Sequence, residues 1–532
     1  MSTLFAQWTH LFRLILKRDR WFLPSWIIGV LLFCISFVPA MPSIAGTAEE
    51  LAVLGEMMKN PALIAMCGIL YGEETTLAII YTQMMFVFST IFAIVMNILI
   101  VIRHTRTDED EGRLEVIRAL PTGRLANLTA VAVLVVGINL ILAVLTGFGM
   151  AAFGVETFTL AGCLVYAAAL GACGLLFAAI TMVVVQFVQT SRSAIGVSMV
   201  LLGGAYVLRA YGDVRSETAA QISPLGLIQR TYPFYENQWW PVVVLVLIGV
   251  VLIVVSIALN SLRDLGLGLL PTLGLRRAHA PRTLSGEWGL SWRLTRGTIL
   301  ACAVTIFILS AGYGSVMGDM EGFIMSNPLY QNMMGIGADT VDIVGPVVTM
   351  LIIIMAIVGI VPVLTTAYKL SSEENKGRLD YVLGKSVSRY RLYAGYAILV
   401  VIVSAVMMAL TALGFWVAAA YVMDEPVGME LIAKVAFNFY PSMFVMGGLG
   451  LFLVGWAKRF TWIGWAYAVF AFLLTYIGGM MDLPRWVQRL APFGLLQRYP
   501  TEPFSWWPWL GLMVAGIILG LLGAVGFRRR DA

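Results

Sequence analysis

Long stretches without a charged side chain recur along this sequence and set the strongest limit on how the chain can fold. About 20 consecutive apolar residues are enough for one helix to cross the hydrocarbon core of a bilayer. The mean hydropathy of +0.87 also lies far outside the range of soluble globular proteins. The runs cover residues 21–37, 77–102, 125–150, 160–187, 194–208, 241–262, 298–316, 343–367, 392–421, 435–457, 460–480 and 507–527. They predict an all-α polytopic membrane protein with about twelve transmembrane helices. For the two shortest runs, 194–208 and 298–316, a re-entrant or interfacial segment is the alternative.

The Lys and Arg residues are distributed unevenly among the gaps between these runs. With the N-terminus on the cytoplasmic side, about three in four of the 35 Lys and Arg residues fall in cytoplasmic gaps, as the positive-inside rule requires. Both termini are therefore predicted to be cytoplasmic. The net charge of +5 reflects this surface and does not indicate nucleic-acid binding.

No carboxylate or basic group stands in the middle of an apolar run. A proton- or sodium-coupled carrier normally holds its ion on an ionisable group within the membrane, so energy is expected to enter from outside the bilayer. The main polar residues in the runs are Gln83, Asn97, Asn139 and Gln186. We expect them to form hydrogen bonds between helices, and contact with a translocated molecule is the less favoured alternative.

Four sequence matches show that the chain is a duplication. The segments 108–115 and 373–380, the segments 224–233 and 492–500, each followed by Trp-Trp-Pro, and two shorter pairs recur in the same order at nearly constant spacing. Each copy has an even number of runs, so the copies should lie parallel, related by an axis along the membrane normal. We predict a first six-span half at 1–262, a cytoplasmic linker with an interfacial helix at 263–297, and a second six-span half at 298–532.

Each half opens with an amphipathic stretch. Leu4, Phe5, Trp8 and Leu11 recur at helical spacing, and basic residues occupy another face. This pattern is typical of a helix that lies in the membrane interface, with its basic side toward lipid phosphates. A simple cap on the first span is the alternative.

The repeated charged segments, residues 108–124 and 371–389, stand out in so apolar a chain. In both copies a Glu stands four residues before an Arg, which favours an ion pair between Glu109 and Arg113 and its counterpart in the second copy. An apolar stripe follows in each, made of Leu114, Ile117 and Leu120 in the first and of Leu379, Val382 and Leu383 in the second. Because the Gly-Arg-Leu-acid core is kept twice, a docking element for a soluble partner is favoured over a solvated turn that only sets topology.

The segment E-x-x-G-R-L-E, followed by LP-x-x-R, resembles the coupling loop of ABC type-2 exporter permeases. The duplicated form, with P-x-G-L-x-Q-R and Trp-Trp-Pro before the last span of each half, resembles the permeases of polyketide-antibiotic exporters, and the likeness covers nearly the whole chain. The resemblance implies a permease in a bacterial cytoplasmic membrane that exports a hydrophobic or amphipathic molecule. It also implies two copies of a separate ATP-binding subunit, which carry the ATP and Mg, and no cofactor in this chain.

Carried over to this sequence, the resemblance places coupling residues in both charged segments. The second segment departs from the pattern where Ala-Leu-Pro becomes Gly384-Lys385-Ser386, and where Glu111 becomes Lys376, so it is expected to dock more weakly or against a different face. The implied coupling residues are Asp108, Glu109, Gly112, Arg113, Leu114, Glu115, Pro121 and Arg124 in the first segment, and Glu373, Glu374, Gly377, Arg378, Leu379, Asp380 and Arg389 in the second.

Several other signals indicate no chemistry of their own. Gly384-Lys385-Ser386 imitates the end of a phosphate-binding loop, but Leu379 stands where that loop needs Gly, so this chain is not expected to bind ATP. The five Cys form no C-x-x-C pair, and the three His are isolated, so neither a metal site nor a catalytic base is predicted.

On the predicted outer side, YPFYENQWW and YPTEPFSWW place aromatic residues at the level of the lipid headgroups, where an interfacial belt is favoured over a ligand platform. Arg230 and Arg498 recur there in both halves. Two roles stay open for these arginines: holding a re-entrant segment through backbone carbonyls, or forming part of an outer gate.

Two other function classes remain as alternatives. An ion-coupled secondary carrier is opposed by the lack of ionisable groups in the runs. A polytopic enzyme acting on lipids would need clustered carboxylates or histidines near one interface, and only the loops with Glu73-Glu74 and with Asp339 and Asp342 offer carboxylates.

Overall fold

The computed structural model describes residues 4–44, 47–59, 61–72, 75–264, 266–269, 286–315, 317, 344–384, 387–423, 427–480 and 484–529. The acidic loop residues Glu73, Glu74, Asp339 and Asp342, the pair Lys385-Ser386 and linker residues 270–285 lie outside this described part. The chain divides into unit 1, Met1–Leu275, and unit 2, Arg276–Ala532, and the dividing point falls within the predicted linker.

Both units consist of helices and turns, with no β-strand among the described residues. Ten of the described helices are long and apolar enough to cross a membrane. Helix α2 (Phe22–Ile35) is apolar but shorter, and α22 (Trp462–Met480) has 19 residues. A helix therefore covers each of the twelve apolar runs, which confirms the prediction of an all-α polytopic membrane protein.

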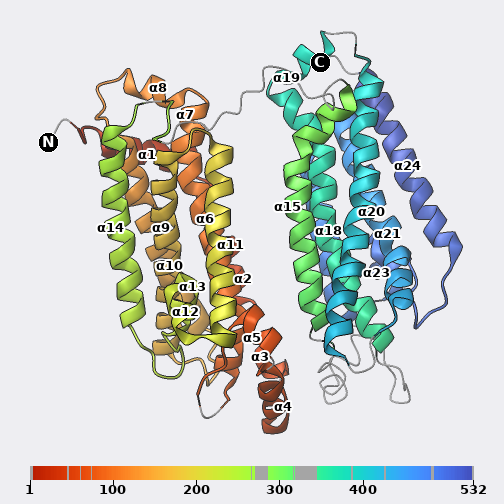
Figure 1. The fold of residues 1–532 in the computed structure, drawn as a ribbon, viewed down its shortest axis with the longest axis horizontal. Helices are drawn as coiled ribbons and strands as arrows, with labels where there is room; N and C mark the ends of the chain where they lie inside the picture. The colour runs from red at the N-terminus through yellow and green to blue at the C-terminus, as the bar shows by residue number, and fades with distance from the viewer. Residues whose placement is uncertain are drawn as a thin grey trace. The chain divides into compact units, whose positions relative to one another are not determined.

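Unit 1 is a bundle in which α10 (Leu160–Phe187) packs against α6 (Leu77–Ile102), α9 (Ala126–Ala151) and α14 (Trp240–Leu262) (Figure 1). Small residues allow this close approach: a Cβ on Gly174 would lie 2.4 Å from Asn139 Oδ1 of α9. Thr159 caps α10 by accepting a hydrogen bond from the Gly162 amide. The remaining helices are α1 (Trp8–Arg18), α3 (Met41–Ile44), α4 (Ala48–Met58), α5 (Pro61–Cys67), α7 (Asp108–Asp110), α8 (Arg113–Arg118), α11 (Ser191–Arg215), α12 (Glu217–Ile222) and α13 (Pro224–Gln229).

In unit 2, α21 (Met429–Trp456) packs closely along α24 (Trp506–Arg529) and against α18 (Val344–Asn375). Glycines again allow a close approach, here between α21 and α24, since a Cβ on Gly455 would lie 2.1 Å from the Gly523 carbonyl oxygen. Helix α15 (Glu287–Ser315) packs against α20 (Arg389–Val422). The shorter elements are α19 (Arg378–Leu383), α23 (Arg485–Gln488) and the 3₁₀ turns Lys458–Phe460 and Pro492–Leu495.

The two halves begin differently. In unit 1, α1 ends at Arg18 and a turn through Asp19 leads into α2, whose third residue is Pro24. Proline has no amide hydrogen to bond back to residue 20, so one helix cannot run through this region undisturbed. In unit 2 the matching amphipathic residues belong to α15 (Glu287–Ser315), which continues without a break into the seventh apolar run. The stretch expected to be a separate interfacial helix is thus the first part of a long helix.

Candidate functional site

Each charged segment is broken by a glycine in the left-handed backbone region. Gly112 has φ 72° and Gly377 has φ 63°. Glycine adopts this conformation without the steric cost that other residues meet, and a single such residue ends a helix. In unit 1 a π-turn, Arg103–Thr107, extends α6 into α7, and Gly112 then redirects the chain into α8. In unit 2, α18 runs to Asn375 and Gly377 redirects the chain into α19.

Because of these breaks, the ion pairs differ from the expected spacing of four. Arg113 lies with its guanidinium 3.1 Å from Asp108 Oδ1 and also pairs with Glu111, while Arg378 lies 3.3 Å from Glu373 Oε2. Asp108 and Glu373 occupy equivalent positions in the two copies. The predicted Glu109–Arg113 pair and its counterpart are therefore wrong, and both copies form the same pair across five positions instead.

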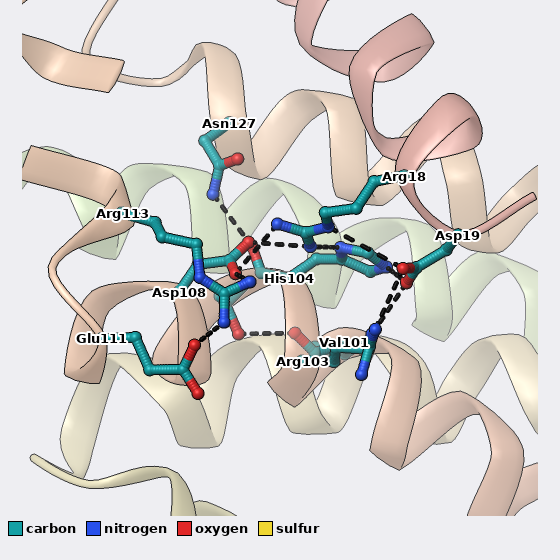
Figure 2. A network of polar contacts seen from close by, with 10 residues as sticks. Arg18, Asp19, Val101, Arg103, His104, Asp108, Glu111, Arg113 and Asn127 are labelled. Atoms are coloured by element: carbon teal, nitrogen blue, oxygen red, sulfur yellow. Dashed lines mark hydrogen bonds and ion pairs between the residues drawn. The ribbon is translucent and has the colours of Figure 1, made fainter. Parts of the chain in front are cut away.

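The buried carboxylate of Asp108 ties the first segment to the N-terminal helix (Figure 2). Arg18, at the end of α1, donates from Nη1 to Asp108 Oδ1 at 3.1 Å and from Nη2 to Oδ2 at 3.0 Å. Two parallel charge-assisted bonds of this kind fix orientation as well as distance. The N-terminal residues add backbone bonds, from the Gly123 amide to the Ala6 carbonyl and from Leu125 to Leu4, both 3.0 Å.

His104 lies fully buried between Arg18 and Asp19. Arg18 Nη2 is 2.5 Å from His104 Nδ1, and His104 Nε2 is 3.2 Å from Asp19 Oδ2. A guanidinium has no acceptor, so Nδ1 accepts and the imidazole proton resides on Nε2, facing the carboxylate. Burial opposes ionisation of Asp19, but bonds from Arg103 at 2.8 and 3.0 Å and the nearby positive charges outweigh it and lower the pKa of this carboxyl.

Glu109 ties the same segment to the chain that follows α14. Its Oε2 lies 2.8 Å from Arg263 Nη2 and 3.1 Å from Arg106 Nη1, and its Oε1 accepts from the Gly266 amide at 2.7 Å. Arg106 is fully buried and also donates to the Val185 carbonyl at 2.8 Å. The segment is thus clamped both to the N-terminal helix and to the end of the sixth span.

The second segment is held by other groups. Glu373 is paired with Lys369 Nζ at 2.9 Å on its own helix, and Glu374 lies 3.1 Å from Lys458 Nζ in the turn after α21. In unit 1 the corresponding turn before α11 also touches its segment, because the Ser191 amide donates to Asp110 at 2.8 Å. Arg389, the last of the carried-over residues, is the first residue of α20.

The two segments present matching inner and outer faces. Leu114 and Leu379 are buried, with 5% and 3% of their surface exposed. Two residues further on, Val116 and Tyr381 are 69% and 81% exposed. In the first segment Ile117 is half-buried and Leu120 is exposed, so the predicted stripe faces the bundle only in part. The other predicted coupling residues Glu115, Pro121, Arg124 and Asp380 are exposed.

The polar residues inside the spans bond within the bundle. Asn97 and Asn139 exchange two side-chain hydrogen bonds between α6 and α9, at 3.0 and 2.7 Å. Gln83 donates to the carbonyls of Met58 and Gly68, at 2.8 Å each. Gln186 donates to Met182 at 3.0 Å and to Ser256 of α14 at 3.4 Å. The prediction of bonding between helices is thus confirmed for the asparagine pair and for Gln186.

Arg230 bonds none of the described backbone carbonyls of the segment between α4 and α6. It pairs with Glu217 at 2.7 Å and with the Tyr232 hydroxyl at 2.8 Å. The arginine that bonds this segment is Arg209, which is fully buried, donates to the Ile64 and Met66 carbonyls and pairs with Asp213 at 3.2 Å. Arg498, the second predicted outer arginine, lines a cavity in unit 2.

Sequence reasoning overlooked several members of these networks. His104 was expected to be isolated, but it lies at the centre of the Arg18–Asp19 contacts. The signal for Arg18 and Asp19 was weak, because a basic–acidic pair at the end of an amphipathic helix reads as ordinary surface charge. Arg209 with Asp213 at a spacing of four was a detectable signal for a paired charge near the end of a span.

Similarity to known proteins extends over nearly the whole chain. The family described as "Multidrug efflux system permease Rv1217c, C-terminal domain" matches residues 9–259 and 284–528, one range within each unit. The chain is also 30% identical over 528 residues to the multidrug efflux system permease protein Rv1217c of Mycobacterium tuberculosis (strain ATCC 25618 / H37Rv). That alignment covers 98% of this chain and 94% of the relative.

Proposed function

Since the chain belongs to the Rv1217c family of multidrug efflux system permeases, we propose that it is the membrane-spanning subunit of an ATP-driven exporter of ABC type. A separate subunit hydrolyses the ATP and carries the Mg. The cargo is a hydrophobic or amphipathic molecule such as an antibiotic, moved out of a bacterial cell across its cytoplasmic membrane. The name of the relative, a multidrug efflux system permease, supports this class of cargo.

One observation carries the coupling proposal: both charged segments turn an equivalent leucine inward and an equivalent apolar side chain outward. Val116 and Tyr381 are exposed beside charged neighbours, Glu115 and Asp380. An exposed apolar or aromatic side chain within a charged rim suits the centre of a docking surface for another protein. Two such surfaces suit two copies of an ATP-binding subunit.

The clamps around the first segment supply a route for the coupling. Asp108 and Glu109 are bonded to α1 and to residues 263–266, and the segment is continuous with α6 through the π-turn. A push on a segment held this way moves α1 and the end of α14 along with α6. Closure of the ATP-binding subunits would thus act on several helices of the half at once, which suits rocking between inward-facing and outward-facing states.

The orientation that we propose rests on the charge distribution together with these contacts. The positive-inside distribution supports a cytoplasmic position for both termini, and the Arg18–Asp108 bonds hold α1 and the first charged segment at the same end of unit 1. The proposed docking surface thus lies on the side where ATP is available.

Affinity purification from gently solubilised native membranes, with mass spectrometry of bound proteins, tests the partner. We expect an ATP-binding subunit at two copies per chain, lost when Arg113→Glu and Arg378→Glu are combined. Arg20→Glu is the matched control, since Arg20 is exposed and makes no ion pair among the described residues. A chain that purifies alone under several mild detergents would contradict the proposal.

The two segments should not contribute equally. Arg113 holds both Asp108 and Glu111, whereas the ion pair of Arg378 in the described structure is with Glu373. We therefore expect Arg113→Glu to uncouple ATP hydrolysis from transport more strongly than Arg378→Glu. Equal uncoupling by the two variants in a reconstituted ATPase and transport assay would refute this asymmetry.

A further inference from the structure

Unit 2 contains a cavity of about 460 Å³ whose lining includes Gln488 of α23. Figure 1 shows that α23 lies away from α19 in this unit. The walls of the cavity come from α18, from α22 and from the chain between residues 488 and 502. This volume is within the range of pockets that take small organic molecules, about 300–1,000 Å³. By the predicted orientation, the end of unit 2 at which α23 lies faces the outside of the cell.

One wall of the cavity is apolar. Met350, Ile353 and Ile357 follow one face of α18, and Phe472 and Phe493 face the cavity from α22 and from the 3₁₀ turn. Such side chains offer a water-free surface to a hydrocarbon or aromatic body. These apolar side chains contribute affinity for the body of a bound molecule but do not discriminate between charged and uncharged molecules.

The other wall carries two arginines. Arg489 and Arg498 both line the cavity, and neither makes an ion pair or hydrogen bond through its side chain among the described residues. Glu502 also lines the cavity, and its amide donates to the Arg498 carbonyl at 2.9 Å. Two guanidinium groups against one carboxylate leave this wall with a net positive charge, and a guanidinium is suited to bind a carboxylate, sulfate or phosphate group.

Comparison of the two copies of the repeat indicates that the net positive charge of this wall is specific to the second copy. Residues 217–230, ETAAQISPLGLIQR, correspond to residues 485–498, RWVQRLAPFGLLQR. Arg230, the counterpart of Arg498, is neutralised by Glu217 at 2.7 Å. In the second copy Arg485 stands at the position of Glu217, and Arg489 stands at the position of Gln221. The copy that lines the cavity has thus exchanged the counter-ion for additional positive charge.

The geometry points to a binding site for an anionic amphipathic molecule, with its apolar body against α18 and α22 and its acidic group against Arg489 and Arg498. The inference rests on the proposed function in taking this molecule to be exported cargo. An anionic membrane lipid has the same chemistry and is the other source. On the predicted outer side, the site would lie at the exit end of the export path.

The test uses the full chain in nanodiscs of zwitterionic phosphatidylcholine and the fluorescent probe 11-(dansylamino)undecanoic acid. We expect saturable binding that weakens about tenfold or more in Arg489→Gln and in Arg498→Gln, as loss of a charge-assisted bond implies. Arg498→Lys should retain most of the affinity. Arg230→Gln is the matched control in unit 1 and should bind like the unaltered chain, and the uncharged methyl ester of the probe should bind all variants equally.

Competition identifies the source of the ligand. If phosphatidylglycerol added to the nanodiscs displaces the probe, the site binds an anionic lipid. If the probe stays bound, the site selects exported cargo over the lipid. Non-saturable binding, or equal affinity of the unaltered chain and both glutamine variants for the anionic probe, would overturn the inference.

This measurement is independent of the proposed coupling because no ATP-binding subunit is present. A chain that binds the probe through Arg489 and Arg498 but purifies without an ATP-binding subunit would contradict only the proposed function. A complex that couples ATP hydrolysis to transport, while its glutamine variants bind the probe unchanged, would contradict only the site.

Discussion

Replacement of Arg18 by Gln should loosen the first charged segment. The change removes two charge-assisted hydrogen bonds to Asp108, at 3.1 and 3.0 Å, and the contact with His104 Nδ1 at 2.5 Å. Hydrogen bonds to charged groups contribute about 1.5–3 kcal/mol each. Arg113 still neutralises Asp108, at 3.1 Å, so we expect a net loss near the lower end of this range, about 2 kcal/mol.

Amide hydrogen exchange measures this loss directly. At about 1.4 kcal/mol per factor of ten, a loss of about 2 kcal/mol raises exchange about 30-fold for amides that exchange by local opening of α7 and α8. Arg13→Gln is the control, because Arg13 lies exposed on the same helix. Peptides from the second segment should not change, since Glu373 is held by Lys369. Unchanged exchange in α7 and α8, or an equal rise in the control, would refute the reasoning.

Three further predictions concern the buried polar groups. Asn139→Leu should destabilise unit 1 by about 1–2 kcal/mol because the buried Asn97 Oδ1 loses the donor that Asn139 Nδ2 supplies, and adding Asn97→Leu should restore part of the loss; thermal unfolding in detergent checks both. Arg209→Gln should cost about 3–5 kcal/mol because Asp213 stays buried without its counter-charge, and a second change, Asp213→Asn, should recover stability by the same assay. The pKa of Asp19 is lowered in the folded chain, so its contribution is present above the ordinary pKa of 3.8 and is lost as the pH falls through the lower folded value. After correction for intrinsic exchange rates, the contribution of Asp19 to the protection of α1 from amide hydrogen exchange should therefore be constant from pH 5 to 8 and fall only below about pH 4. Asp19→Asn should remove that acid-dependent loss.

The spans could be predicted because the signal that defines them is local. A helix in a bilayer needs one uninterrupted apolar run, so a window of the sequence carries the whole requirement. The run at 194–208 shows the limit of this approach. It lies within α11 (Ser191–Arg215), whose last part includes a buried Arg209–Asp213 pair that hydropathy places outside the membrane.

The partners of the charged residues could not be predicted because they are distant in sequence. Arg18 precedes Asp108 by 90 residues, and Arg263 follows Glu109 by 154. The i,i+4 rule applies only to residues on one continuous helix. The pair that it predicted between Glu109 and Arg113 does not form because Gly112 ends the helix between them. The sequence shows this glycine in both copies of the repeat. Its effect on the ion pairs can be derived only once the path of the backbone is known.

The duplication makes it possible to separate what both segments need from what each half adds. Both copies keep the left-handed glycine, the ion pair across five positions, the buried leucine and the exposed apolar residue two positions later. They differ in the cations that hold the acidic residues. In unit 1 these are Arg18 of α1 and Arg263 after α14, whereas in unit 2 they are Lys369, on the helix of Glu373 itself, and Lys458 in the turn after α21. The shared features suffice to present a docking surface, so they should determine whether a partner binds. The distant cations connect that surface to α1 and to the end of α14 in unit 1, but only to the turn after α21 in the described part of unit 2. They should determine how far the movement of the surface spreads, and this difference predicts that the two halves respond unequally to the same partner.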